Sequence, residues 1–100
     1  MQILERAESQ AASGVEVTIV IRNELGLHGR PAAKLTQVAQ QFEGRITLEY
    51  EGMTADARSI LDILSLAAGK DASITVRCHG EDAALAAETI RAVLSGDEGC

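Results

Sequence analysis

The sequence predicts an α+β domain of two layers, in which helices cover one face of a largely antiparallel sheet. Four short segments alternate apolar and polar residues with the period of two that is typical of a half-buried strand. Three other segments repeat apolar residues at helical spacing. The segments follow one another in the order βαββαβα. Because each strand has one polar face, we expect one face of the sheet to be exposed to water.

The size and composition of the chain fit one such domain. Its 100 residues suffice for a single core, and 46% of them are hydrophobic against 24% charged. Phe42 and Tyr50 are the only aromatic residues, so the core must be aliphatic and rich in alanine. We expect residues 15–95 to form the domain, residues 1–14 to be a flexible N-terminal extension, and residues 96–100 to be a frayed tail.

In the first half of the chain a strand, a loop and a helix are expected. Residues 15–22 alternate as a strand, and residues 23–29, which include two glycines, are interpreted as a loop. The helix should open at Pro31, where the missing N–H costs nothing in the first turn, and Gly44 should be its C-cap. The apolar stripe of this helix comprises Leu35, Val38, Ala39 and Phe42.

The second half of the chain is expected to form three more strands and two more helices. Glu51-Gly52 is interpreted as the turn of a hairpin. A short helix should begin at Ser59, because the pattern Ser-x-x-Asp is typical of a capping box, and Gly96 should end the last helix. The strands are expected over residues 45–50, 53–57 and 73–78, and the helices from residue 59 to residues 68–71 and over residues 83–94.

The charge of the chain bears on its partners. The net charge is −6 and the pI is about 4.8. Attraction to a nucleic-acid backbone or an anionic membrane therefore has the wrong sign, whereas docking onto basic patches of other proteins is favoured. No window approaches the roughly 18–20 apolar residues of a membrane span, and the N-terminus lacks the apolar region of a secretory signal. We expect no nucleic acid, no membrane insertion and a cytoplasmic protein.

Neither cysteine is predicted to take part in catalysis or metal binding. Cys78 lies in a strand-like segment and is interpreted as a small buried hydrophobe, and whether it pairs with Cys100 stays open. His79 follows Cys78 on the same strand, so the two side chains point to opposite faces and do not chelate one metal ion. Neither a glycine-rich phosphate loop nor a Ser-His-Asp arrangement is visible. The sequence therefore predicts no metal and no cofactor, and it argues against a hydrolase.

The most informative stretch is residues 26–33, which reads Gly-Leu-His-Gly-Arg-Pro-Ala-Ala. The first N–H groups of a helix have no partner within it, and the helix dipole makes that end an anion site. Arg30 adds a planar cation suited to phosphate oxygens. His28, kept neutral by the same field, presents a nucleophilic nitrogen that can take a phosphoryl group. In a plainer alternative, His28 only caps the helix and Arg30 is a solvated surface charge.

Two segments together resemble a known family. The sequence Gly-Leu-His-Gly-Arg-Pro-Ala, between a first strand and a first helix, resembles the active-site signature of HPr, the histidine-containing phosphocarrier of the phosphoenolpyruvate-dependent phosphotransferase system. Residues 57–70 are similar to the regulatory-serine helix of that family and the loop after it, and residues 48–52 match its second hairpin. The resemblance covers residues 15 to about 95. It implies an HPr-like sheet of four antiparallel strands covered on one face by three helices.

The resemblance implies roles for residues of the first segment. His28 would accept a phosphoryl group from enzyme I on Nδ1 and pass it to a IIA protein, and Arg30 would be the cationic partner of the phosphohistidine. Gly29 stands where alanine or threonine is usual in the family and, with Arg30, would form the phosphate-stabilising helix start. Glycine costs about 0.5–1 kcal/mol in backbone entropy relative to alanine, so we expect a less rigid site.

The second segment has a structural and a regulatory interpretation. As a helix N-cap, Ser59 is worth about 1 kcal/mol. By resemblance, Ser59 matches the serine that HPr kinase phosphorylates in lineages that possess this kinase, and Asp62 would repel a phosphate there. Ile60, Leu61 and Leu64 are apolar at helical spacing, which ordinarily indicates core, but the family uses part of this face for docking partners.

Three hypotheses follow for the function. The first is a monomeric phosphocarrier, a covalent relay and not an enzyme, whose partners are enzyme I, IIA components and, where one exists, an HPr kinase/phosphorylase. The alternative is a purely regulatory module, in which phosphorylation of His28 or Ser59 tunes binding to another protein without sugar transport. The third is an unrelated α+β ligand-binding domain in which His28 is incidental.

Overall fold

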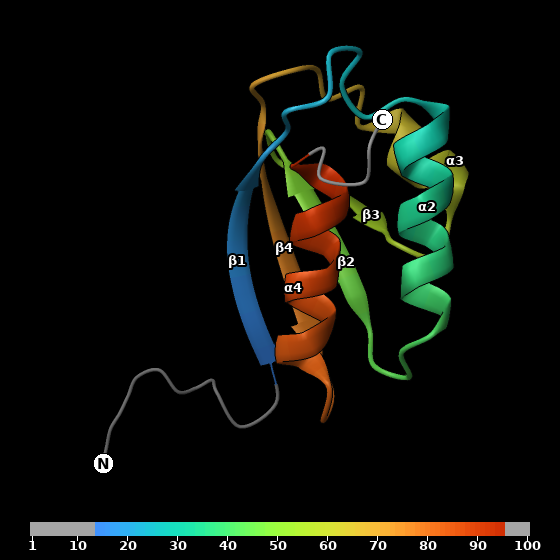
Figure 1. The fold of residues 1–100 in the computed structure, drawn as a ribbon, viewed down its shortest axis with the longest axis vertical. Coiled ribbons are helices and arrows are strands. Elements are labelled where there is room, and N and C mark those ends of the chain that lie inside the picture. Colours follow the sequence, from blue (N-terminus) through green and yellow to red (C-terminus); the bar gives the residue numbers. More distant parts are fainter. Residues whose placement is uncertain (1–13, 96–100) are drawn as a thin grey trace.

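The computed structural model describes residues 14–95 and has the predicted βαββαβα order (Figure 1). One antiparallel sheet with the strand order β1-β4-β2-β3 is covered on one face by three helices, which confirms the predicted fold class. The predictions for residues 1–13, for Gly96 and for Cys100 lie outside the described residues. The strands are β1 (Gly14–Val20), β2 (Ile46–Tyr50), β3 (Met53–Asp56) and β4 (Ser73–His79), and the helices are α2 (Gly29–Gln40), α3 (Ile60–Ser65) and α4 (Ala83–Leu94).

A single aliphatic core lies between the helices and the sheet. Helices α2 and α4 lie side by side over the sheet, and α3 packs against α2 (Figure 1). Each large aliphatic side chain that is fully buried in this core stabilises the fold by about 1.5–3 kcal/mol. The largest fully buried side chains include Ile21, Leu35, Leu48, Ile63, Ile74 and Ile90.

Among residues 14–95, no helix is both long and apolar enough to cross a membrane.

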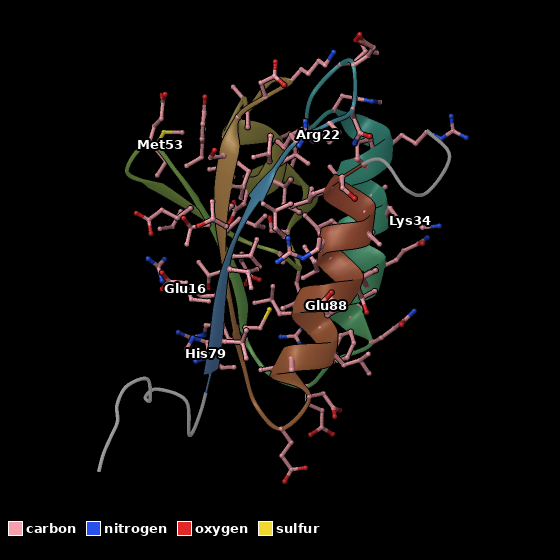
Figure 2. All side chains as sticks on the ribbon, turned by 60° about the vertical axis from the view of Figure 1, so that its left-hand side comes forward. Glu16, Arg22, Lys34, Met53, His79 and Glu88 are labelled. Atoms are coloured by element: carbon pink, nitrogen blue, oxygen red, sulfur yellow. The ribbon has the colours of Figure 1, made fainter. Side chains whose placement is uncertain are left out.

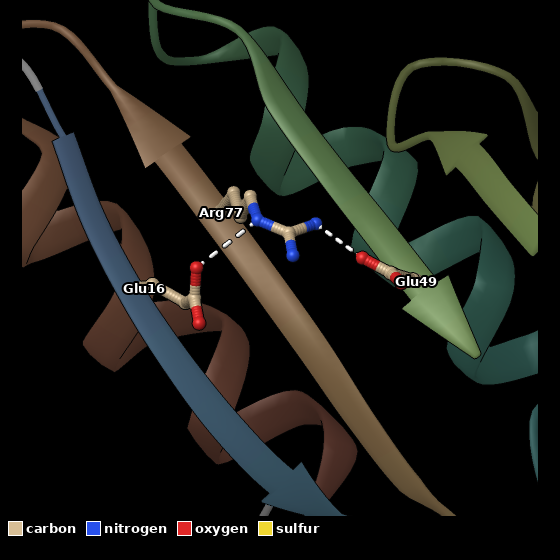
Figure 3. A network of polar contacts seen from close by, with 3 residues as sticks. All are labelled: Glu16, Glu49 and Arg77. Carbon is tan, nitrogen blue, oxygen red and sulfur yellow. Dashed lines mark hydrogen bonds and ion pairs between the residues drawn. The ribbon is translucent and has the colours of Figure 1, made fainter. Parts of the chain in front are cut away.

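The other face of the sheet is polar, as predicted. Arg77 in β4 lies between Glu16 of β1 and Glu49 of β2 and donates to both carboxylates (Figure 3). The distance from Arg77 Nε to Glu16 Oε1 is 3.0 Å. The hydrogen bond to Glu49 is the main cause that raises the pKa of Arg77. The two pairs link three strands. Because their side chains remain partly exposed to water, the pairs contribute little to stability.

The first helix starts earlier and ends earlier than predicted. It begins at Gly29, so Pro31 is its third residue, still in the first turn where no N–H is needed. It ends at Gln40, where the amides of Gln41 and Phe42 bond to carbonyls three residues back (3.0 and 3.3 Å) and so tighten the last turn. Phe42 therefore lies beyond the helix, where it is half-buried against the core.

The prediction that Gly44 is the C-cap of this helix is wrong. Gly44 lies several residues beyond the helix end, against the backbone at the end of β4. A Cβ at this position would lie 1.6 Å from the carbonyl oxygen of His79. The glycine is therefore needed for a close approach of two chain segments and not for a helix ending.

The hairpin turn and the start of α3 agree with the sequence, but α3 is shorter than expected. Glu51 and Gly52 both have positive φ (51° and 81°), as a two-residue hairpin turn requires. Ser59 Oγ accepts a hydrogen bond of 3.2 Å from the Asp62 amide, which confirms the N-cap. Helix α3 ends at Ser65, before the expected residues 68–71, because Ala67 adopts a left-handed φ of 53°.

Candidate functional site

His28 is the N-cap residue of α2. Its backbone is extended (φ −98°, ψ −166°), and its carbonyl accepts the first helical hydrogen bond, 3.0 Å from the Ala32 amide. The imidazole makes no capping hydrogen bond and is half-buried. The backbone of His28 therefore starts the helix while its side chain takes no part in the cap, which argues against the plainer alternative in which His28 only caps α2.

The first turn of α2 leaves donors without a partner in the helix. The amides of Gly29 and Arg30 lie before the first i→i+4 bond, and Pro31 has no N–H. No acidic residue lies in this turn, so nothing within it offsets the positive end of the helix dipole. A Cβ at Gly29 would have no atom within 4 Å, so alanine would fit here too.

Hydrogen bonds hold the loop before His28 in place. The amide of His28 donates to the carbonyl of Gly26 (3.0 Å), and the amide of Leu27 donates to the carbonyl of Ala68 (2.9 Å). Gly26 has a φ of 75°, and a Cβ there would lie 2.6 Å from that same Ala68 oxygen, so only glycine fits. The site loop is thus fixed to the segment that follows α3.

His28 borders a hollow of about 400 Å³. Arg30 lines it from the start of α2, Arg22 and Asn23 from the loop after β1, and Ser95 from the C-cap of α4. The amide of Arg22 donates to a carbonyl in the last turn of α4 over 3.2 Å, which ties these two walls together. Glu24 lines the hollow as well, and its carboxylate is paired with Lys70 over 3.2 Å. The hollow therefore brings two arginines beside a histidine and a helix N-terminus, an arrangement suited to an anion.

The three apolar residues named for α3 are exposed. Ile60, Leu61 and Leu64, called the α3 apolar surface from here on, have 37%, 73% and 37% of their surface exposed. Ser59 is half-buried at the N-terminus of the same helix. Because α3 packs against α2 and the chain after α3 bonds to Leu27, helix α3 lies near the His28 loop (Figure 1).

Cys78 and His79 lie on opposite faces of β4, as predicted. Cys78 is fully buried, and burial raises the pKa of its thiol to about 11. His79 is exposed at the end of the strand, far along the sheet from Arg22, which lines the His28 hollow (Figure 2). Within residues 14–95, no group of three His, Cys, Asp or Glu side chains is arranged to hold a metal ion.

The sequence analysis did not single out Asn23, which it placed in a loop. Asn23 is only 6% exposed and is the one buried polar or charged residue among residues 14–95. Its Nδ2 is also the one buried side-chain nitrogen or oxygen in that range without a hydrogen-bond partner. No sequence signal distinguishes it, because the burial of one polar residue in a loop depends on tertiary contacts and not on its neighbours along the chain.

Comparison with known proteins gives a family and close structural matches. The family model described as the PTS HPr component phosphorylation site matches residues 15–95. The crystal structure of the phosphocarrier protein HPr from Bacillus anthracis str. Ames is 36% identical, with a TM-score of 0.78, over 82% of this chain and 98% of that chain. HPr-C-His from Thermoanaerobacter tengcongensis is 32% identical, with a TM-score of 0.80, over 86% and 97% of the two chains.

A third match is to a catabolite-repression protein. The crystal structure of Crh from Bacillus subtilis is 34% identical, with a TM-score of 0.65, over 76% of this chain and 87% of that chain. That protein is described as an intertwined dimer with a swapped domain. Relatives of this chain thus include carrier proteins and a protein of catabolite repression.

The buried thiol predicts a change of stability at alkaline pH. Because the pKa of Cys78 is raised from 9.0 to about 11, the folded protein holds this proton more tightly than the unfolded chain does. The raised pKa contributes on the order of 2 kcal/mol to the free energy of unfolding. This contribution is complete below pH 9 and is lost as the pH rises through 11. Denaturant unfolding at a series of pH values from 8 to 11 measures this loss of stability.

The control is Cys78→Ala, which keeps every other titrating group. This variant should be less stable throughout because a buried sulfur is removed, but its stability should fall less between pH 9 and 11. Equal pH slopes in the two proteins would contradict the assignment.

Proposed function

Because the chain belongs to the HPr family of phosphotransferase-system phosphocarriers, we propose that His28 accepts a phosphoryl group from enzyme I and passes it to IIA proteins. The observation that carries this proposal is the position of His28 at the N-cap of α2, with an imidazole that takes no part in capping. The protein is then a covalent relay and not an enzyme with a turnover of its own.

The chemistry of the relay is a pair of phosphoryl transfers. Nδ1 of His28 attacks the phosphorus of the donor, a nitrogen–phosphorus bond forms, and the bond to the donor breaks with its electron pair leaving on the donor. In the second transfer the IIA acceptor attacks the same phosphorus, and the electron pair of the broken bond returns to His28. No metal or cofactor of this chain is needed for either step.

The surroundings of His28 support the bound state. The phosphoryl group adds negative charge, and the free amides of Gly29 and Arg30 lie at the positive end of α2. The guanidinium of Arg30 lines the same hollow and can pair with phosphate oxygens. Since these groups are in place before the transfer, little reorganisation is needed when the charge arrives.

We propose that partner proteins dock on the α3 apolar surface. A surface of three exposed aliphatic side chains beside a reactive residue is suited to transient protein contacts, in which a few buried anchors carry most of the binding energy. We further propose that the domain of residues 15–95 acts as a monomer in the cytoplasm, with flexible segments at residues 1–14 and 96–100.

A second function is favoured by Ser59 and by the similarity to Crh. Ser59 stands at the edge of the α3 apolar surface, where an HPr kinase/phosphorylase could modify it. A phosphate there would put charge beside Asp62 and the docking residues, and the cost of desolvating that charge would weaken binding. The chain would then also serve as a regulatory module, with or without sugar transport.

Replacing His28 tests the relay directly. In His28→Ala, labelling by phosphoenolpyruvate and enzyme I should fall to background, because the accepting nitrogen is removed. His79→Ala is the matched control, since it removes the other histidine of the chain at an exposed site and should be labelled like the native protein. Mass mapping of the modified residue measures both. Label that persists in His28→Ala would refute the assignment and favour the hypothesis of an incidental histidine.

Replacing Leu61 tests the docking surface. Leu61→Ser should slow phosphoryl transfer from enzyme I by about fivefold to tenfold, as the loss of one interface anchor does. Its stability should barely change, because Leu61 is 73% exposed. Leu85→Ser on α4 is the matched control, with 61% exposure, and its transfer rate should be unchanged. Stopped-flow or quenched transfer assays measure the rates, and equal slowing in both variants would argue against an α3 docking site.

The regulatory proposal is tested with ATP and an HPr kinase. Mass mapping should find phosphate on Ser59 in the native protein and in Ser65→Ala, which alters the same helix, but not in Ser59→Ala. Protein phosphorylated on Ser59 should then transfer to IIA more slowly. An absence of label on Ser59 would remove the regulatory function and leave the relay untouched.

A further inference from the structure

The inference concerns the buried amide of Asn23. With 6% exposure, Asn23 is more than nine-tenths buried, and its Nδ2 has no hydrogen-bond partner. The backbone carbonyl of the same residue is used, since it accepts from the Gly26 amide at 3.0 Å. Among the buried side-chain nitrogens and oxygens of residues 14–95, this side-chain donor is the one that is left without a partner.

An unpartnered buried donor is unfavourable for the resting protein. Leaving such a group unsatisfied costs about 1–3 kcal/mol, and nearly all buried polar groups in folded proteins are paired. An asparagine that only filled space in this loop could be replaced by an apolar residue without that cost. The retained donor thus indicates an acceptor that is present in another state of the protein.

The position of Asn23 indicates which acceptor this is. Asn23 lines the same hollow as His28 and Arg30. Arg22 and Glu24, the neighbours of Asn23 in the chain, line the hollow as well, and the carboxylate of Glu24 is paired with Lys70 over 3.2 Å. A group bound there therefore meets two arginines and one amide donor. Such a set of donors is suited to the three oxygens of a phosphoryl group, which accept hydrogen bonds strongly.

We propose that Asn23 is a phosphate-binding residue of the phosphorylated state. When His28 carries the phosphoryl group, the side-chain amide of Asn23 turns into the hollow, and Nδ2 donates a hydrogen bond to a phosphoryl oxygen. The proposal rests on the proposed function of His28. It adds that the phosphorylated form gains a hydrogen bond that the resting form lacks, so Asn23 raises the phosphorylated fraction at equilibrium.

The first experiment observes this amide directly. Asn23 is the only asparagine of the sequence, so protein labelled with ¹⁵N-asparagine gives one side-chain amide pair in an NMR spectrum. On phosphorylation by enzyme I, one Nδ2 proton should shift downfield and exchange more slowly with water. A side-chain pair that does not move while His28 becomes phosphorylated would overturn the proposal.

The second experiment removes the donor. In Asn23→Ala, the equilibrium constant for phosphorylation at a fixed ratio of phosphoenolpyruvate to pyruvate should fall about tenfold, the value of one hydrogen bond to a charged acceptor. Ile74→Val is the control, since it truncates a fully buried residue of the core and lowers stability without touching the hollow. Its equilibrium constant should be unchanged.

The outcomes separate the two proposals. If Asn23→Ala is less stable but reaches the phosphorylated fraction of the native protein, Asn23 only supports the loop, and the inference is wrong while the relay stands. If the native protein is not labelled on His28 at all, the proposed function itself fails. Only a drop in the equilibrium constant for phosphorylation that occurs in Asn23→Ala and is absent from Ile74→Val supports the inference.

Discussion

The candidate site depends on the unpaired start of α2. A helix must begin with amides that have no partner inside it, and in most proteins a side chain covers them. Here the N-cap residue contributes only its backbone, so the amides of Gly29 and Arg30 stay without a partner in the helix, next to an imidazole that takes no part in the cap. The loop that makes this possible is held from outside, by the bond from Leu27 to Ala68. The geometry of the site is therefore a property of the whole fold.

The charge of the chain and the charge of the site have opposite signs. The net charge of −6 would repel an anion at a distance. At contact distance the local field decides, because Arg22 and Arg30 line the hollow and the dipole of α2 points its positive end toward it. Among residues 14–95, the one carboxylate that lines the hollow, that of Glu24, is paired with Lys70. An acidic protein can thus hold a phosphoryl group on one small area while the rest of its surface stays acidic.

The features that were found from the sequence are those set by neighbours along the chain. The positions of His28 and Arg30 at the start of α2 and the Ser59 cap follow from local pattern and helix-end chemistry, and the strands follow from alternation. The helix start was displaced by two residues, because the extended backbone of His28 is not visible in residue types. Gly44 was misjudged for a different reason: its role is a contact with the backbone of His79, which comes much later in the chain.

Two local departures from low-energy structure lie close to this site. Ala67 has a left-handed backbone, which costs an L-residue about 1–2 kcal/mol, and it directly precedes the carbonyl that anchors the His28 loop. Asn23 buries a donor without a partner beside His28. Proteins retain such costs where function needs them. A carrier must release its phosphoryl group as readily as it accepts it, so part of the stabilisation has to appear only when the group is bound. A donor that is unsatisfied at rest has that property, whereas a donor already paired in the resting protein would have to break one bond to make another.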